Sequence, residues 1–346
     1  MATELEREMR EQGGELASRA ERGWADAKAA AELLGREDVD YLMVVARGSS
    51  DNAARYGQYL LGAEAGLTVA LAAPWLFRQG RRPPSLARAA VLAISQSGQS
   101  PDVAAVLAAA RDQGRPTLAI TNDPASPMAA LADVVIDLRV GPERSVAATK
   151  TYTASLHALA QITALLGASQ DWREWLDRLP TIISETVDAQ LESRRRFDPL
   201  AGFAPLTAVG RGLDYATAFE TALKVRELSG RPAEAFSPPD LIHGPIAAIQ
   251  GSTVLWAVSS GADTSPETLD AVQGVCVRAG LRIAVSADPR ILALADIAVP
   301  IPKRLPAWAA AIVAIVPGQA AALRLAELDG IDVDAPHGLS KVTMTR

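Results

Sequence analysis

The sequence has 346 residues, a formal net charge of −6 and an apolar content of 49%. This length is sufficient for two domains of roughly 150 residues each. The acidic balance does not provide the basic surface that nucleic-acid binding requires, so we expect no nucleic-acid partner. The single cysteine, Cys276, excludes an intramolecular disulfide and a cysteine-based zinc site.

Residues 1–35 are predicted to form a helical arm, because charged and alanine-rich turns carry Leu5, Leu16, Trp24 and Leu33 before Gly35. The amino terminus has alternating charges and lacks the apolar segment of a signal peptide. No later stretch offers about 18 apolar residues without a charge or a proline. We therefore expect a cytoplasmic protein with no membrane partner.

Residues 36–185 alternate apolar runs with helical stretches. The apolar runs are "YLMVVARGSS" from Tyr41, "LTVALAA" from Leu67, "AAVLAISQSG" from Ala89 and "PTLAIT" from Pro116. Continuous apolar strands that alternate with helices predict an α/β domain with a parallel sheet covered on both faces.

After the helical and charged segment 151–200, the same pattern returns over residues 200–330. "LTAVGRG" (206–212) matches "LMVVARG" (42–48), and "VLWAVSSG" (254–261) matches "VLAISQSG" (91–98). We predict two doubly wound, flavodoxin-like domains related by internal duplication, although a chance likeness of two α/β domains is an alternative. A helix at about 306–328 is expected to lead into a tail, residues 331–346.

The stretch "AISQSGQSPDV" (93–103) places three serines around Gly98. In open α/β sheets, ligands bind outside the carboxyl ends of the strands, where a glycine permits close approach and the next helix presents free amides. We predict a neutral phosphate site, whose donors are Ser95, Gln96, Ser97 and Ser100. The alternative is that these serines only cap the helix that begins near Pro101.

A second candidate set lies on the helix that ends near Gly230. Glu220, Lys224 and Glu227 have the spacing of one helical face, as a solvated salt-bridge stripe also would. His243, one of three histidines, follows in "HGP". A carboxylate and an imidazole are the groups that can open a sugar ring and move a proton between adjacent carbons.

"SQSGQS" (95–100) resembles the phosphosugar-binding turn of the sugar isomerase (SIS) domain family, SxSGxT, with serine in place of threonine. Two further segments are similar to the isomerase half of glutamine:fructose-6-phosphate aminotransferases. They are "ALKVRELSGRPAEAFSPPDLIHGPIAAI" (222–249) and the tail "DVDAPHGLSKVTMT" (332–345).

This resemblance implies a role for each matched residue. Glu227 would be the acid/base for proton transfer between C1 and C2, and Lys224 would polarise the reacting oxygens. His243 would assist ring opening in a neighbouring subunit's site, and Lys341 would form a Schiff base near C2. The remaining sugar and phosphate contacts would come from Ser50, Thr149 and the backbone around Val146 to Ala148.

The sequence also departs from the family pattern. Asp240 stands where glutamate is usual, Ala148 where a hydroxyl residue is common, and His337 where arginine is usual. The glutaminase of the aminotransferases needs its own nucleophilic cysteine, whereas Cys276 lies deep in the second half. We therefore expect that glutamine is not the nitrogen donor.

We expect isomerising deamination of glucosamine 6-phosphate, a small-molecule sugar phosphate, to fructose 6-phosphate and ammonia. One alternative is a fructosamine-6-phosphate-type deglycase or another aldose/ketose amino-sugar phosphate isomerase. Another is a noncatalytic phosphosugar sensor. Three scattered histidines provide no ligand spacing, so we expect neither a metal nor an organic cofactor. The resemblance implies a homodimer with shared active sites.

Overall fold

The computed structural model describes residues 2–78, 80, 82–167, 171–261, 264–335, 338 and 341. They form two compact units. The first-sheet unit comprises residues 14–143, 150–180 and 340–346, and the second-sheet unit comprises residues 1–13, 144–149 and 181–339. Residue His337, at which the sequence departs from the family tail, lies outside the described residues.

The first-sheet unit contains five parallel strands in the order β2-β1-β3-β4-β5. Their bounds are β1 Tyr41–Val45, β2 Thr68–Leu71, β3 Ala89–Ile94, β4 Thr117–Thr121 and β5 Val134–Asp137. The chain leaves β1 toward β2 and returns to β3 on the other side of β1. This places the topological switch point between β1 and β3, where open α/β sheets bind ligands.

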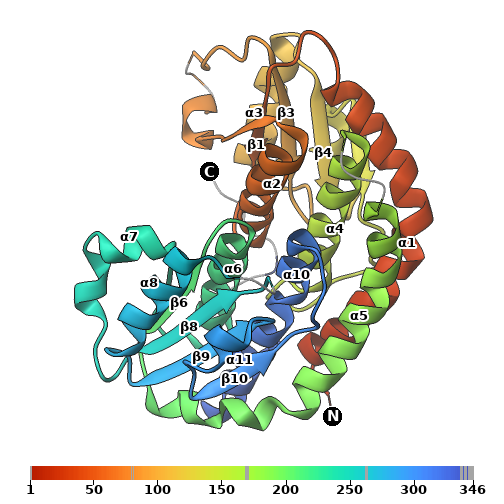
Figure 1. Cartoon of the computed structure of the whole chain (residues 1–346). Helices are drawn as coiled ribbons and strands as arrows, with labels where there is room; N and C mark the ends of the chain where they lie inside the picture. The colour runs from red at the N-terminus through yellow and green to blue at the C-terminus, as the bar shows by residue number, and fades with distance from the viewer. Residues whose placement is uncertain are drawn as a thin grey trace. The chain divides into compact units, whose positions relative to one another are not determined.

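Helices pack on both sides of this sheet (Figure 1). Helix α2 contacts β1, β2 and β3, whereas α3 contacts β3 and β4. Right-handed crossovers in opposite directions along a sheet place such helices on opposite faces. The helix bounds are α1 Glu4–Leu34, α2 Ser49–Ala65, η1 Pro74–Phe77, α3 Pro101–Asp112, η2 Ala129–Leu131, α4 Lys150–Leu165 and α5 Trp172–Glu192. The predicted amino-terminal helix is thus confirmed as α1.

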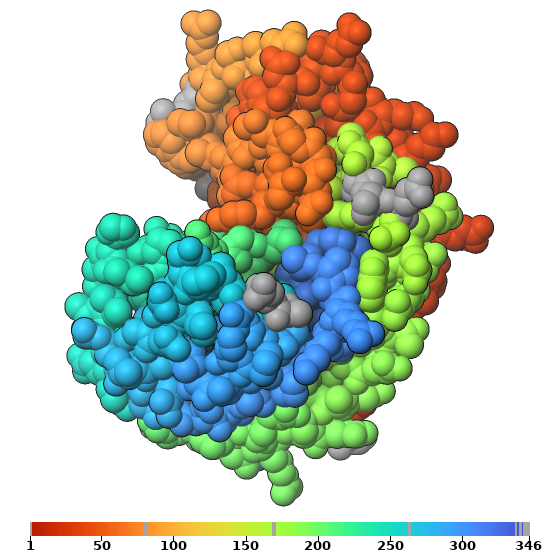
Figure 2. Space-filling model, viewed as in Figure 1, coloured from red at the N-terminus to blue at the C-terminus, as the bar shows by residue number. Residues whose placement is uncertain are grey.

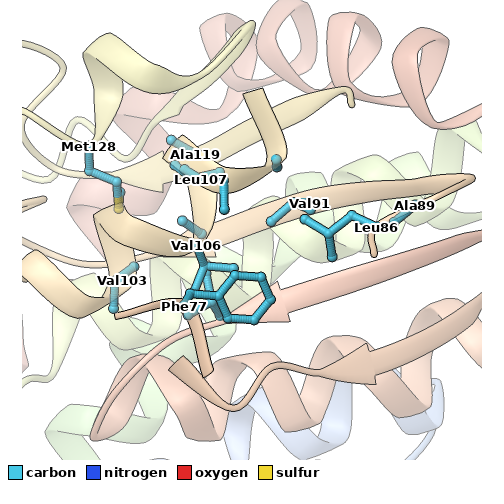
Figure 3. Close-up of a cluster of buried hydrophobic side chains, with 13 residues drawn as sticks. Phe77, Leu86, Ala89, Val91, Val103, Val106, Leu107, Ala119 and Met128 are labelled. Atoms are coloured by element: carbon cyan, nitrogen blue, oxygen red, sulfur yellow. The ribbon is translucent and has the colours of Figure 1, made fainter. Parts of the chain in front are cut away.

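The core beneath α3 is built from apolar side chains of the strands and of η1. Figure 3 shows Phe77 beside Val103 and Val106, with Val91 and Leu86 on the strand β3 side. Every residue of β3 is buried, which is the pattern expected of a central parallel strand. This buried strand fixes the position at which the serine-rich turn begins.

The second-sheet unit repeats the topology. Its five parallel strands have the order β7-β6-β8-β9-β10, which is the order of the first sheet. The bounds are β6 Leu206–Gly210, β7 Ala233–Phe236, β8 Val254–Ser259, β9 Leu281–Ser286 and β10 Ile297–Pro300. Two doubly wound parallel sheets with one strand order confirm the predicted α/β fold class.

The helices of this unit include α6, which contacts β6, β7, β8 and α11. The bounds are η3 Arg194–Gly202, α6 Leu213–Ser229, α7 Pro238–Ile242, η4 Pro245–Ala248, α8 Pro266–Cys276, α9 Pro289–Leu292, α10 Ala307–Val313 and α11 Ile315–Leu328. The helix expected at about 306–328 is therefore divided into α10 and α11 at Ala314.

Among the described helices, the segment Ala307–Leu328 is long and apolar enough to cross a membrane. However, 94% of its apolar window is buried inside the protein, as in the core helix of a soluble protein. The close approach of α11 to α6 supports this interpretation, because a Cβ at Gly318 would lie 2.5 Å from Oγ1 of Thr221. The expected cytoplasmic location stays a prediction.

The strand ladders correct one detail of the predicted repeat. Val45 pairs with Ala93 in the first sheet, and Val209 pairs with Ala257 in the second. Val209 therefore corresponds to Val45, and Ala257 to Ala93, with the same shift in residue number. This shift makes Ser259 the counterpart of Ser95. The match of Gly261 with Gly98 is therefore wrong by one residue, because the strand register rather than the glycine fixes the alignment.

Candidate active site

The serine-rich turn begins directly after β3 and ends at the first residue of α3. The amide of Ser95 donates to the carbonyl of Ile120 at 3.0 Å, which extends the ladder with β4 by one residue. Gly98 has a φ of +60°, and a Cβ there would lie 2.1 Å from Oγ of Ser126. Both the backbone conformation and the available space thus require glycine at this position.

The serine hydroxyls retain donors for a ligand. Oγ of Ser95 accepts from the amide of Gly98 at 3.1 Å, and Oγ of Ser97 accepts from the amide of Gln99 at 3.3 Å. Ser100 is the N-cap residue of α3, but its side chain makes no capping hydrogen bond. Helix capping therefore does not account for these serines, and their hydroxyl hydrogens can donate to an anion at the start of α3.

Ser50 lies in the first turn of α2, beside the same switch point. β1 and β3 are neighbours in the sheet, so the turn after β1 and the turn after β3 emerge at one edge. A salt bridge of 2.6 Å between Arg47 and Asp102 joins these two turns. The first-sheet unit thus brings together the predicted contacts Ser50, Ser95, Gln96, Ser97 and Ser100 at the carboxyl ends of adjacent strands.

Lys341 also belongs to the first-sheet unit. Its Nζ donates to Oε2 of Glu143 at 2.9 Å. The side chain of Glu143 has an exposed fraction of 0%, and that of Lys341 has 22%. Thr151, in the first turn of α4, donates to the same carboxylate from its amide at 3.1 Å and from Oγ1 at 2.6 Å. Thr151 of α4 therefore holds the carboxylate of Glu143 in place while that carboxylate binds Lys341.

Asn122 connects the serine turn with the segment that carries Glu143. Its amide donates to the carbonyl of Gln96 at 3.0 Å, and its side chain accepts from the amide of Val140 and donates to the carbonyl of Gly141. Sequence reasoning missed both Asn122 and Glu143. The position of Asn122 directly after an apolar strand was the signal that could have identified it.

In the second-sheet unit, Lys224 lies between two carboxylates of α6. Its Nζ is 3.3 Å from Oε1 of Glu220 and 2.5 Å from Oε2 of Glu227. The side chains of Lys224 and Glu220 are exposed by 1% and 0%, so this face of the helix is not a solvated stripe. Glu227 is the member that reaches solvent, with 23% of its side chain exposed.

The electrostatics of this cluster follow from burial and charge. Burial alone would lower the pKa of Lys224, but the charges of Glu220 and Glu227 outweigh it and raise that pKa above its ordinary value. Lys224 is therefore a permanent cation. It compensates the buried charge of Glu220 and leaves Glu227, at the end of the cluster, as the carboxylate available to a ligand.

His243 follows α7 and is exposed. It lines a cavity of about 280 Å³ together with Arg211, Pro238, Pro239, Ile242, Glu267 and Ala271. In Figure 2, α7 and α8 (turquoise to light blue) lie on the surface. In the described part of the chain, no hydrogen bond joins His243 to Glu227.

The segment 144–149 belongs to the second-sheet unit and is held by α1. The buried carboxylate of Glu8 accepts from the amides of Arg144 and Ser145. Val146 and Ala148 are half-buried and Thr149 is fully buried. This anchoring presents the backbone around Val146 to Ala148 in a defined conformation, while the predicted ligand role of these residues stays a prediction.

The counterpart of the serine turn in the second-sheet unit differs in charge. Asp214 occupies the position of Ser50, and its Oδ2 accepts from the amide of Ser260 at 2.8 Å. Burial raises the pKa of Asp214 to about 6. The adjoining cavity has a volume of about 440 Å³. Because a carboxylate already accepts from the loop amide and would repel phosphate, this turn is poorly suited to a phosphate ester.

The chain is similar to known proteins in both sequence and fold. The sequence model of the SIS domain matches residues 38–165. A glutamine–fructose-6-phosphate aminotransferase (isomerizing) from Gloeobacter violaceus is 34% identical over 319 residues, which cover 88% of this chain and 52% of that protein. The chain thus spans about half the length of the curated relatives it matches.

Solved structures share the fold over the whole chain. A protein from Silicibacter pomeroyi, provisionally titled a phosphosugar isomerase, has a TM-score of 0.85 and 28% identity, covering 96% of this chain and 100% of its own. Glucosamine-6-phosphate deaminase from Thermotoga maritima has a TM-score of 0.78 and 20% identity, covering 99% and 100%, and supports the fold alone. The match assigns residues 38–165 of this chain to the SIS domain family.

Proposed function

We propose that the protein catalyses the isomerising deamination of glucosamine 6-phosphate, in which substrate and water give fructose 6-phosphate and ammonia. The observation that carries this proposal is the Glu220–Lys224–Glu227 cluster, whose buried cation holds one partly exposed carboxylate ready to accept a proton. Transfer of a proton between adjacent carbons needs one such base at a fixed position.

The phosphate is proposed to bind at the serine turn. The hydroxyls of Ser95, Ser97 and Ser100 keep hydrogens to donate, and the amino-terminal end of α3 contributes a positive partial charge. When the turn binds the phosphate ester, C1 and C2 of the sugar lie at a fixed distance from the turn. The second-sheet counterpart, with Asp214, takes no part in phosphate binding.

Glu227 performs the isomerisation in this proposal. Its carboxylate removes the proton from C2 of the open-chain amino sugar and returns it to C1. The amino nitrogen loses one proton and the oxygen at C1 gains one, so the aldehyde becomes a hydroxymethyl group and an imine remains at C2. Lys224 stabilises the developing negative charge on the oxygen at C1.

Lys341 then releases the nitrogen. Its amine adds to the imine carbon C2, the original nitrogen leaves as ammonia, and a lysine imine of the ketose remains. Water hydrolyses this imine to fructose 6-phosphate and free Lys341. The sum consumes one water and liberates one ammonia, as the proposed reaction requires.

Cys276 is not suited to glutamine hydrolysis within these 346 residues. It is buried in the core of the second-sheet unit, and this burial raises the pKa of its thiol. Glutaminase chemistry requires an accessible thiolate. Cys276 is therefore not a candidate nucleophile for glutamine hydrolysis.

We also propose that the active protein is a homodimer in which His243 assists ring opening in the neighbouring subunit. His243 is exposed, and the adjacent Ile242 has an exposed fraction of 52%, which suits a contact surface. Mixing inactive Glu227→Gln chains with inactive His243→Asn chains should restore about a quarter of the wild-type activity, because hybrid dimers contain one intact site. No recovery after verified subunit exchange would contradict the shared site.

The reaction itself is tested with purified protein and glucosamine 6-phosphate, by measuring ammonia and fructose 6-phosphate. Equal amounts of both products are expected. If neither forms and the protein instead cleaves a fructosamine-type 6-phosphate, it is a deglycase. If it binds both compounds and converts neither, it is a sensor, and the proposed function is wrong.

A further inference from the structure

We propose that Glu143 is the proton acceptor and donor for Lys341. The inference rests on the proposed function, because it assigns a partner to the lysine that forms the imine. Nζ of Lys341 lies 2.9 Å from Oε2 of Glu143, which is the distance over which a proton passes directly between the two groups.

Glu143 is built as a fixed base rather than as a surface partner. Its side chain is fully buried, and both of its oxygens accept from Thr151, one from the amide and one from the hydroxyl. These contacts anchor the carboxylate to α4, so it cannot follow a lysine that moves. A surface ion pair formed only to restrain the tail would not need a buried and doubly anchored carboxylate.

The chemistry of imine formation requires such a group. A lysine ammonium has no lone pair, so it must lose one proton before nitrogen can attack C2. Oε2 of Glu143 takes this proton as the new nitrogen–carbon bond forms. When the original carbon–nitrogen bond breaks, the carboxylic acid returns the proton to the departing amine, which leaves as ammonia. Glu143 is thereby regenerated as a carboxylate, and no other reactant is consumed.

The same network places the pair relative to the serine turn. The segment that carries Glu143 is fixed through Val140 and Gly141 to Asn122, which bonds to the carbonyl of Gln96 in the turn. Lys341 is thus tied, through Glu143, to the turn proposed to hold the phosphate.

The test uses the full chain and fructose 6-phosphate, without ammonia or glucosamine 6-phosphate. Borohydride reduces a lysine imine to a stable secondary amine, and mass spectrometry locates it. We expect an adduct on Lys341 in the wild-type protein and none in Lys341→Arg. In Glu143→Gln, the rate of adduct formation should fall about 100-fold, at the lower end of the range for general acid–base catalysis.

Chemical rescue separates proton transfer from positioning. Added formate should restore adduct formation in Glu143→Ala, but not in Lys341→Arg, because a small carboxylate replaces the missing base only where the lysine remains. Glu143→Asp should retain more activity than Glu143→Gln, since it keeps a carboxylate. Melting temperatures establish that each variant is folded.

The outcomes distinguish this inference from the proposed function. A wild-type protein that forms no adduct overturns the imine step and this inference together. A wild-type adduct that forms equally fast in Glu143→Gln overturns the role of Glu143 alone, as does an absence of formate rescue in folded Glu143→Ala. If Glu143→Ala does not fold, the activities of Glu143→Asp and Glu143→Gln are compared instead. A higher activity in Glu143→Gln than in Glu143→Asp would contradict the inference.

Discussion

Nζ of Lys224 lies 2.5 Å from Oε2 of Glu227, and the lysine side chain is almost fully buried while the glutamate is partly exposed. A buried cation therefore fixes the carboxylate proposed to act as the base. Glu220, which has no exposed surface, lies 3.3 Å from the same ammonium. The cluster thus contributes both to the stability of the fold and to the proposed activity. Substitutions at its different members can test the two contributions separately.

Lys224→Met should strongly destabilise the protein, because it removes the cation that compensates the buried charge of Glu220. Removing one member of a buried ion pair costs about 3–5 kcal/mol, whereas replacing both members by apolar residues is often nearly neutral. The double variant Glu220→Leu with Lys224→Met should therefore be more stable than Lys224→Met alone. Urea denaturation of the variants measures this difference, and equal stability of the single and double variants would refute the interpretation.

Ser100→Ala should weaken phosphosugar binding without loss of stability. Its hydroxyl makes no capping bond, and a hydrogen bond to a charged group contributes about 1.5–3 kcal/mol, so KM should rise by roughly 10-fold or more. Ser265→Ala is the matched control, because Ser265 accepts from the amide of Thr268 and caps α8. It should lose about 1 kcal/mol of stability and leave KM unchanged. A loss of stability with an unchanged KM in Ser100→Ala would show that Ser100 has only a structural role.

Gly98→Ala should disrupt the serine turn. The residue has a positive φ, and its Cβ would overlap Oγ of Ser126. Gly114→Ala is the control, because Gly114 has a similar φ of +64° but open space around its Cβ position. We expect loss of sugar-phosphate binding by calorimetry in Gly98→Ala, and only the backbone cost of about 1 kcal/mol in Gly114→Ala. Wild-type affinity in Gly98→Ala would contradict the proposed phosphate site.

His157 should make the protein sensitive to acid. The side chain is fully buried, and Nδ1 accepts from Nη1 of Arg19 at 2.7 Å. Burial, with a smaller contribution from the charge of Arg19, lowers the pKa of His157 to about 3. The unfolded chain binds a proton near pH 6.5 and the native protein does not, so stability is lost as the pH falls from 6.5 toward 3.

The size of this effect follows from the same linkage. Each pH unit in this range costs about 1.4 kcal/mol through His157. His157→Gln should reduce the loss of unfolding free energy between pH 6.5 and pH 5 by about 2 kcal/mol, measured by urea denaturation at the two pH values. An unchanged difference between the two pH values in His157→Gln would show that other groups control acid sensitivity.

Much of the fold could be predicted because its signals are local. Continuous apolar runs identified β1, β2, β3, β4, β6 and β8 from the sequence alone. The strands β5, β7 and β10 were not predicted, since each has four residues and only partial burial at an edge of its sheet. The repeat was recognised, but its alignment was one residue wrong where a glycine was given more weight than the strand register.

The candidate site shows the same division between local and distant information. The serine turn could be predicted because its donors are adjacent in the sequence. The spacing of Glu220 and Lys224 identified their shared face, but their burial depends on the tertiary packing of α6, which spacing does not reveal. Glu143 could not be found, because it is 198 residues from Lys341 and only tertiary folding brings the two together.

The central claim is that Glu227 transfers the proton while the serine turn holds the phosphate. The most direct measurement compares Glu227→Gln with the wild-type protein for both ammonia release from glucosamine 6-phosphate and calorimetric binding of fructose 6-phosphate. We predict that turnover falls by at least about 100-fold while the Kd changes little, and that Glu234→Gln, an exposed carboxylate of β7, alters neither. Turnover that persists in Glu227→Gln, or that falls only in proportion to the binding affinity, would contradict the account.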